Sequence, residues 1–242
     1  EPVEGNPCFM AKNWHRFNIT YLTEVKRQEN KDFVNALNLI RVGKVKEALP
    51  WFKDNIQFID KPNINFRGIT FFPTNNEVDI YNRRALERLK GDSRFYYAKL
   101  EGIAHPTWNE IPKQLEVKKG AIIQLLYNDL VNGFANGDAA IVNEMWDNAL
   151  HISLLRRNKN IFLRPRKLEN FELNSSGFQV KKPIGTLNVL HCKLMYSSSV
   201  HKAQGLTLDK VQICLKGPGR AFLARQSGML YTALSRVKTP EG

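Results

Sequence analysis

The spacing of apolar residues in the first third of the chain predicts helices that alternate with strands. Apolar positions recur at helical spacing over residues 33–40 and again over 45–52, although Pro50 interrupts the second pattern. Residues 17–22 alternate and are rich in aromatic and β-branched types, which predicts a strand, and the apolar run 69–72 predicts a second, buried one. This order is typical of an α/β domain.

A capping box follows the buried strand. Thr74, Asn75, Asn76 and Glu77 place a hydroxyl three residues before a carboxylate, which predicts the start of a helix with apolar positions as far as Leu89. A strand, a tight turn and a helix N-terminus in this order put backbone N–H groups and small polar side chains at a sheet edge, where phosphates bind. We therefore predict that Thr74 and Asn75 contact phosphate.

From about residue 115 to 185 the pattern changes to short apolar segments separated by turn residues. Strands are expected at 121–126, 139–142, 151–155, 160–163 and 177–180. Short strands with turns between them predict a small β-barrel inserted into the α/β domain. Residues 156–167 within it include six basic side chains in twelve and no acidic one, a run that taken alone is typical of a solvated face.

The final stretch returns to α/β order. The pattern predicts a strand at 191–196, a turn or short helix at 199–204, a second buried strand at 211–215 and a helix at 222–236. The α/β domain is therefore expected to be discontinuous in sequence, with the barrel between its two parts.

Composition narrows the range of partners. The 242 residues include 36 Lys+Arg against 23 Asp+Glu, a formal charge of +13 that favours a polyanion such as nucleic acid. The chain has no uncharged apolar run long enough to span a membrane, so no membrane partner is expected. Cys8, Cys192 and Cys214 are odd in number and widely spaced, which predicts neither a disulfide framework nor a zinc site and favours a reduced, intracellular protein.

Several kinds of chemistry are disfavoured by the motifs. The only Gly-Lys pair, Gly43-Lys44, lacks the first glycine and the hydroxyl of a Walker A loop. Ser199, His201 and Lys202 lie too close on one turn to form a nucleophile and base with a third orienting group. A nuclease would need clustered carboxylates for metal ions, and the sequence shows no such cluster and no metal site.

Motif patterns along the whole chain resemble superfamily 1B DNA helicases of the Pif and RecD type. Residues 198–209 resemble motif V, residues 231–237 resemble motif VI, and residues 22–28 with Phe33 and Leu37 resemble motif IV. The other matches, in the family's order, are 2–5 with Phe9 and Trp14 at the end of motif III, 74–78 with Asn82 between motifs IV and V, and 119–126 with Asn136-Gly137 before the barrel. Several matches in register are more specific than any single one.

The resemblance implies a fold and a place in a longer protein. It implies a RecA-like domain of the P-loop-NTPase type that lacks the P-loop, formed by residues 1–134 and 189–242, and a small SH3-like β-barrel at 135–188. Motifs I and II precede motif III in this family, so the chain is expected to be the C-terminal motor half of an ATP-dependent helicase. That helicase would move 5′ to 3′ on single-stranded DNA and unwind duplex.

The resemblance also implies which residues act. Arg236 and Arg27 would serve as catalytic arginine fingers, because a guanidinium stays ionised and bonds phosphate oxygens in pairs. ATP binding would involve Gln28, Gln204, Gly205 and Arg236. DNA contacts would come from Thr74, Asn75, Ser198, Ser199, His201, Lys202, Arg156, Arg157 and Arg164, with Phe162 and Phe178 as candidates for base stacking.

The implied cofactors and partners follow from those roles. ATP and Mg²⁺ would serve the full-length parent, with the Mg²⁺ ligands outside this chain. The partners would be single-stranded DNA, forked duplex DNA and the N-terminal RecA-like domain of the same parent. The alternative is a non-catalytic single-strand-binding module derived from a helicase domain. A Walker A loop and an acidic pair encoded upstream of Glu1 would favour the motor.

Overall fold

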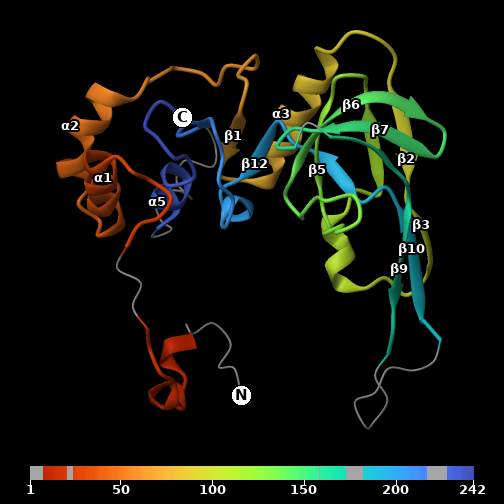
Figure 1. Ribbon diagram of the computed structural model, residues 1–242, viewed down its shortest axis with the longest axis horizontal. Coiled ribbons are helices and arrows are strands. Elements are labelled where there is room, and N and C mark those ends of the chain that lie inside the picture. Colours follow the sequence, from red (N-terminus) through yellow and green to blue (C-terminus); the bar gives the residue numbers. More distant parts are fainter. Residues whose placement is uncertain (1–7, 21–23, 158, 173–181, 217–227) are drawn as a thin grey trace.

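The computed structural model describes residues 8–20, 24–157, 159–172, 182–216 and 228–242, and its main elements form two adjoining lobes (Figure 1). The helices are α1 (Lys31–Arg41), α2 (Val45–Asn55), α3 (Asn75–Glu87) and α5 (Met229–Leu234), with 3-10 turns η1 (Cys8–Met10), η2 (Trp14–Arg16), η3 (Pro106–Glu110) and η4 (His201–Ala203). The strands are β1 (Ile69–Phe72), β2 (Arg94–Tyr97), β3 (Lys99–Gly102), β4 (Gln114–Val117), β5 (Ile122–Leu125), β6 (Ala139–Trp146), β7 (Ala149–Leu154), β8 (Lys159–Leu163), β9 (Arg166–Asn170), β10 (Gly185–Val189), β11 (Cys192–Leu194), β12 (Ser197–Ser199) and β13 (Val211–Ile213).

A parallel sheet in the order β12-β1-β13 forms the centre of the first lobe. All four residues of β1 are buried, because the strand is central and both sheet faces are covered. Phe71 packs in a cluster with Met229 and Ala233 of α5, whereas Phe72 on the opposite face packs against Tyr81 of α3. The prediction of an α/β arrangement around residues 69–72 and 211–215 is confirmed.

Local capping accounts for the starts of two helices. Asn30 Oδ1 accepts a hydrogen bond from the Phe33 amide at 2.9 Å before α1. Thr74 Oγ1 accepts one from the Glu77 amide at 3.4 Å and donates to Glu77 Oε2 at 2.7 Å, so the predicted capping box opens α3. Helix α2 continues through Pro50 as far as Asn55.

Antiparallel strands form the second lobe. The largest sheet has the order β11-β5-β6-β7-β8, and its inner face carries fully buried side chains such as Ile123, Val142 and Ile152. Strands β3-β10-β9 form a long separate ribbon, and β2 pairs with β4 (Figure 1). Because β5 and β11 lie outside residues 135–188, the largest sheet extends beyond the predicted insertion on both sides. The domain bounds therefore stay a prediction.

Some predicted elements differ from the structure. The strand expected at 17–22 is wrong for its described part, because residues 17–20 form no strand and Phe17 and Ile19 are exposed. Alternation without a neighbouring strand leaves the backbone N–H and C=O groups unpaired, so no ladder forms. Residues 21–23, the strand expected at 177–180 and the start of the helix expected at 222–236 lie outside the described residues.

Candidate nucleotide and nucleic-acid sites

Two arginines from distant parts of the sequence meet at the C-terminal end of α5. Arg27 Nη1 donates to the Ser235 carbonyl at 2.7 Å, and its Nε donates to Thr207 Oγ1 at 3.1 Å. Arg236 Nη2 donates to Ser235 Oγ at 2.6 Å, and its Nε donates to the Thr232 carbonyl at 2.6 Å. The two residues predicted to act on ATP therefore share Ser235 as a support.

The positive charge of Arg27 and Arg236 has no acidic ion-pair partner in the part of the chain that the structure describes. Among the ion pairs of the described residues, none involves Arg27 or Arg236. Burial lowers the pKa of Arg236, which is only 8% exposed, and the nearby Arg27 charge lowers it further. Two cations held together without a carboxylate favour the approach of an anion, and phosphate oxygens match the guanidinium fork.

Gln28 holds the segment that carries Arg27 against the segment that carries Arg236. Its buried Nε2 donates to the Ser235 carbonyl at 3.1 Å and to the Val237 carbonyl at 2.7 Å. The other predicted ATP-binding residues, Gln204 and Gly205, lie in the exposed turn after η4. Gly205 has a φ of +87°, a left-handed conformation that favours glycine.

A cavity of about 620 Å³ lies between α3, η3, β4, β11 and β12, and we call it groove 1. It collects four of the residues predicted to contact DNA: Asn75, Ser198, Ser199 and Lys202. Thr74 lies beside it as the N-cap of α3. Residues that are far apart in sequence thus line one surface. An amide, two largely buried hydroxyls and an ammonium group lie there, in a lining that also includes Asp79, Glu110 and Glu116.

Asn82 of α3 fixes the strand that forms the floor of groove 1. Its Oδ1 accepts hydrogen bonds from the Tyr196 amide at 3.1 Å, the Ser197 amide at 2.8 Å and the Ser197 hydroxyl at 3.1 Å. This buried amide therefore sets the position of β12 and, through it, of Ser198 and Ser199.

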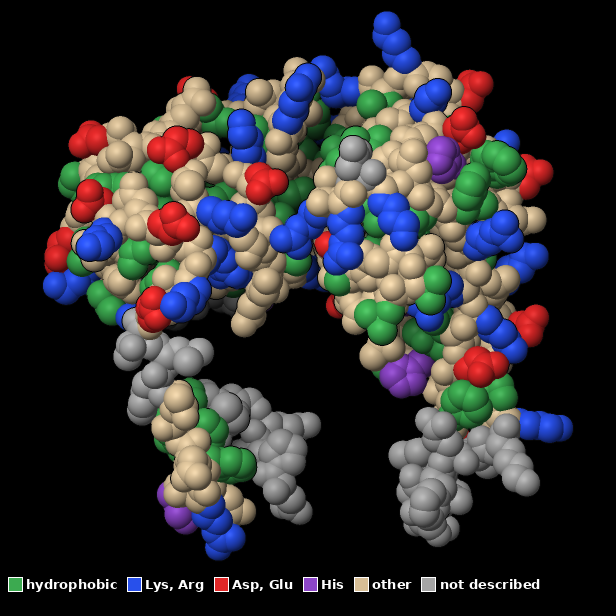
Figure 2. Space-filling model, in the orientation of Figure 1, with side chains coloured by type: hydrophobic (Ala, Val, Ile, Leu, Met, Phe, Trp, Pro, Cys, Tyr) green, Lys and Arg blue, Asp and Glu red, His purple; other side chains and the backbone are tan. Residues whose placement is uncertain are grey.

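A second cavity of about 570 Å³, groove 2, continues towards the antiparallel lobe. Its lining includes His201 and Gln204, and it shares Glu110, Ile111, Lys193 and Lys202 with groove 1. Figure 2 shows Lys and Arg side chains gathered where the two lobes meet. The surface that the two grooves share carries Lys193 and Lys202 beside the carboxylate of Glu110.

Lys193 is a groove residue that our reading of the sequence did not single out. Burial lowers its pKa, and the charge of Lys202 lowers it further. Lys202 itself lies 3.8 Å from a carboxylate oxygen of Glu110. The available signal was the alternation in β11, where Cys192 is buried and Lys193 faces the other side of the sheet.

The basic side chains predicted to contact DNA from residues 156–167 are exposed. Arg156, Arg157 and Arg164 all lie at the surface, and Arg156 approaches an Asp138 carboxylate oxygen at 3.8 Å. Phe162 is 49% exposed and stacks on the His151 ring at a centroid distance of 5.0 Å. Its ring is therefore at the surface instead of in the core, and Phe178 lies outside the described residues.

His191 lines groove 2 and has an unusual environment. Its ring stacks on Tyr127 at a centroid distance of 5.5 Å, and its buried Nδ1 has no hydrogen-bond partner among the described residues. Burial lowers the pKa of His191 to about 4, with a further contribution from the Arg166 charge. The imidazole is consequently neutral at physiological pH.

We expect His191 to make the fold less stable in acid. In the unfolded chain the imidazole becomes protonated near pH 6.5, whereas in the folded chain it does so only near pH 4. The free energy of unfolding therefore decreases as the pH is lowered from 6.5 to 4. The loss is on the order of 1–2 kcal/mol after allowance for partial exposure. Urea unfolding of wild type and His191→Phe at several pH values tests this, because parallel pH profiles for the two proteins would contradict it.

Within the described residues, no helix has the length and apolar character needed to cross a membrane. The same residues contain no group of three or more His, Cys, Asp or Glu side chains placed to hold a metal ion.

Comparison with known proteins relates the whole chain to one group of helicases. No family model matches the chain. It is 30% identical over 248 residues to the ATP-dependent DNA helicase PIF1 of Xenopus laevis, which covers 97% of this chain and 36% of that protein. It is 27% identical over 237 residues to the ATP-dependent DNA helicase Pif1 of Campylobacter jejuni, which covers 90% of this chain and 51% of that protein.

Solved structures give the same result. The crystal structure of Bacteroides Pif1 bound to ssDNA matches with a TM-score of 0.69 and 26% identity, over 93% of this chain and 51% of that one. The chain thus spans about half the length of this structure, and about a third to a half of the two curated relatives. In sequence and in its mixed α/β fold, the chain is similar over nearly its whole length to a part of Pif1-type DNA helicases.

Proposed function

We propose that the chain is the C-terminal motor half of an ATP-dependent DNA helicase that moves 5′ to 3′ on single-stranded DNA and unwinds duplex. In this proposal the first lobe is a RecA-like domain and the second contains an SH3-like barrel. The N-terminal half of the parent supplies the Walker A loop, the acidic pair and the ligands of Mg²⁺. The Pif1 relatives support the assignment through their names and through the DNA-bound Bacteroides structure.

Groove 1 is the observation that carries this proposal. Asn75, Ser198, Ser199 and Lys202 were selected from sequence motifs, and the structure brings them onto one cavity. Short polar side chains and a lysine are the groups that position a nucleic-acid backbone without reading its sequence. Groove 2 extends this surface towards the barrel, where His201 and Lys202 also contribute.

In this proposal the barrel adds a second contact with the single DNA strand. Arg156, Arg157 and Arg164 are exposed cations, and the Phe162 ring lies at the surface. A basic surface with accessible rings binds single strands with little sequence preference. Contacts at the two lobes, together with opening and closing of a nucleotide cleft, support stepwise movement along DNA.

The nucleotide role rests on the arginine pair. A guanidinium supplied across a cleft stabilises charge on the transferred γ-phosphoryl group and accelerates hydrolysis by about 10³–10⁵. The proximity of Arg236 and Arg27 and their lack of an ion-pair partner among the described residues support this role. Since the phosphate loop and the Mg²⁺ ligands belong to the N-terminal half in this proposal, the isolated chain is not expected to hydrolyse ATP.

Removing the groove lysines is expected to weaken DNA binding. Lys193→Met and Lys202→Met retain the apolar stem and lose the charge, so each should raise the Kd for fluorescent oligo(dT) about 5- to 10-fold and reduce the salt slope by about one. Lys46→Met, an exposed lysine on α2, is the matched control and should bind like wild type. If all three variants raised the Kd equally, or if none raised it, the grooves would not be the surface that binds DNA.

A further inference from the structure

The loop 129–134 holds two apolar side chains almost completely in water. Leu130 is 97% exposed and Val131 is 91% exposed, well above the other large apolar residues of the described chain. Adjacent exposed aliphatic side chains at one tip are costly for solubility and often mark a surface that contacts another molecule.

Hydrogen bonds within the loop hold Leu130 and Val131 in this exposed position. Asp129 Oδ1 accepts from the amides of Val131 at 3.0 Å and Asn132 at 2.9 Å, and its Oδ2 accepts from Asn132 Nδ2 at 2.8 Å. These bonds lower the pKa of the Asp129 carboxyl. Gly133 adopts a φ of +77°, and Phe134 is anchored in the core of the lobe. The two apolar side chains are therefore presented by an ordered scaffold.

Cations surround the base of the loop. Lys159 Nζ donates to the Asn132 carbonyl at 2.9 Å, and an Arg157 guanidinium nitrogen lies 3.4 Å from where a Cβ on Gly133 would stand. The Arg166 guanidinium lies over the Tyr127 ring at 4.0 Å. The acid of the loop itself, Asp129, is committed to hydrogen bonds within the loop. The loop thus combines an apolar tip with basic side chains near its base.

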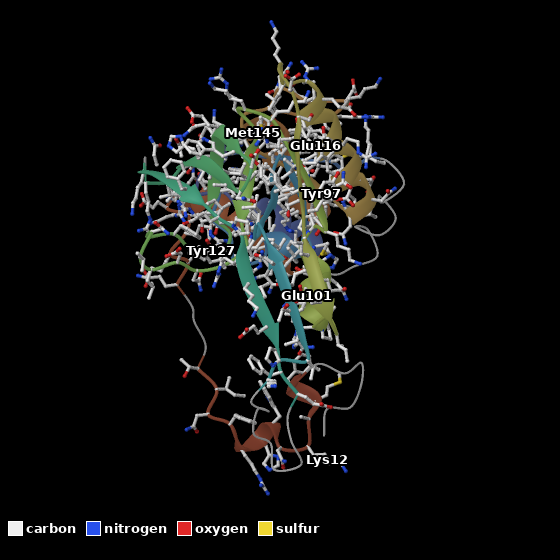
Figure 3. All side chains as sticks on the ribbon, turned by 90° about the vertical axis from the view of Figure 1, so that its right-hand side faces the viewer. Lys12, Tyr97, Glu101, Glu116, Tyr127 and Met145 are labelled. Atoms are coloured by element: carbon white, nitrogen blue, oxygen red, sulfur yellow. The ribbon has the colours of Figure 1, made fainter. Side chains whose placement is uncertain are left out.

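The loop is also continuous with groove 2. Leu126 and Asn136, which precede and follow it, both line that groove. Between them, Tyr127 stacks on the groove residue His191. Figure 3 shows Tyr127 on one side of the lobe, with Tyr97 and Glu116 on the other. A nucleic-acid strand that leaves groove 2 past Asn136 would therefore reach the loop 129–134 next.

We propose that the tip formed by Leu130 and Val131 inserts against the bases of a nucleic-acid strand that leaves groove 2, while Arg157 and Lys159 contact its phosphates. This inference rests on the proposed function of the grooves and adds a base contact to it. Cations alone bind any polyanion, whereas aliphatic side chains gain only from an apolar surface such as a base face. Leucine wedges of this kind separate stacked bases in other DNA-binding proteins.

Abasic DNA separates the two kinds of contact. Wild type should bind a base-bearing single strand about 5-fold more tightly than an abasic strand of equal length, and the double variant Leu130→Ser/Val131→Ser should lose this preference. Its Kd for the abasic strand should match that of wild type, because the phosphate contacts remain. A 2-aminopurine in the base-bearing strand should change fluorescence with wild type and not with the variant.

The controls distinguish the possible failures. Val42→Ser, at the exposed end of α1, removes an apolar side chain away from both grooves and should behave as wild type. Unchanged binding and fluorescence in the double variant would overturn the loop contact alone. No binding of either strand by wild type would overturn the proposed function of the grooves and this inference with it. Binding of phosphatidylserine vesicles that depends on the tip, with DNA binding unaffected, would assign the tip to a membrane surface instead.

Discussion

Arg236→Ala is expected to lower DNA-stimulated ATP hydrolysis about 1,000-fold or more in the longer helicase that we propose contains this chain. Binding of single-stranded DNA should stay within about twofold, because Arg236 lies outside both grooves. The reason is the loss of a bidentate cation that meets the γ-phosphate only as charge develops on it. Steady-state turnover at saturating DNA, with Kd measured in parallel, provides the test.

Two variants control this experiment. Arg236→Lys keeps the charge and loses the planar fork, so most of the rate should still be lost. Arg84→Ala removes an exposed arginine on α3 and should leave turnover unchanged. Unchanged turnover in Arg236→Ala would remove this residue from the mechanism.

Asn82→Ala should lower the free energy of unfolding by about 3 kcal/mol, because it leaves the amides of Tyr196 and Ser197 without their buried acceptor. Loss of this support also displaces β12, so affinity for single-stranded DNA should fall as well. Urea unfolding monitored by circular dichroism measures the first effect, and fluorescence anisotropy measures the second.

The matched control lies on the same helix. Asn76 is exposed and makes no side-chain hydrogen bond that fixes β12, so Asn76→Ala should change stability by less than about 0.5 kcal/mol. A loss below about 1 kcal/mol in Asn82→Ala would show that water replaces the amide oxygen and that β12 is held by its strand pairing alone.

Local rules predicted α1, α2, α3 and the central strand correctly from the sequence, whereas the start of the helix expected at 222–236 lies outside the described residues. The start of α3 depends on Thr74 and Glu77, which are three residues apart, and the burial of β1 follows from its apolar run. The strand expected at 17–22 was wrong for residues 17–20, because strand formation depends on a partner that no local pattern reveals.

Only those site residues that belong to a sequence motif could be predicted. Arg27 and Arg236 were chosen from separate motifs, and the structure adds that both bind Ser235. Lys193 was missed because the alternation that turns it away from the buried Cys192 does not show that a groove lies on that side of the sheet. Leu130 was missed for the opposite reason, since an apolar residue between two strands is expected in the core until tertiary structure shows it in water.

The two carbonyls that Gln28 binds lie on either side of Arg236, and this arrangement has a mechanical consequence. Val237 packs in the same cluster as Phe33 and Leu37 of α1, so hydrogen bonds and apolar contacts connect α1 to the backbone on both sides of Arg236. A movement of that backbone would therefore be transmitted to α1 through these contacts.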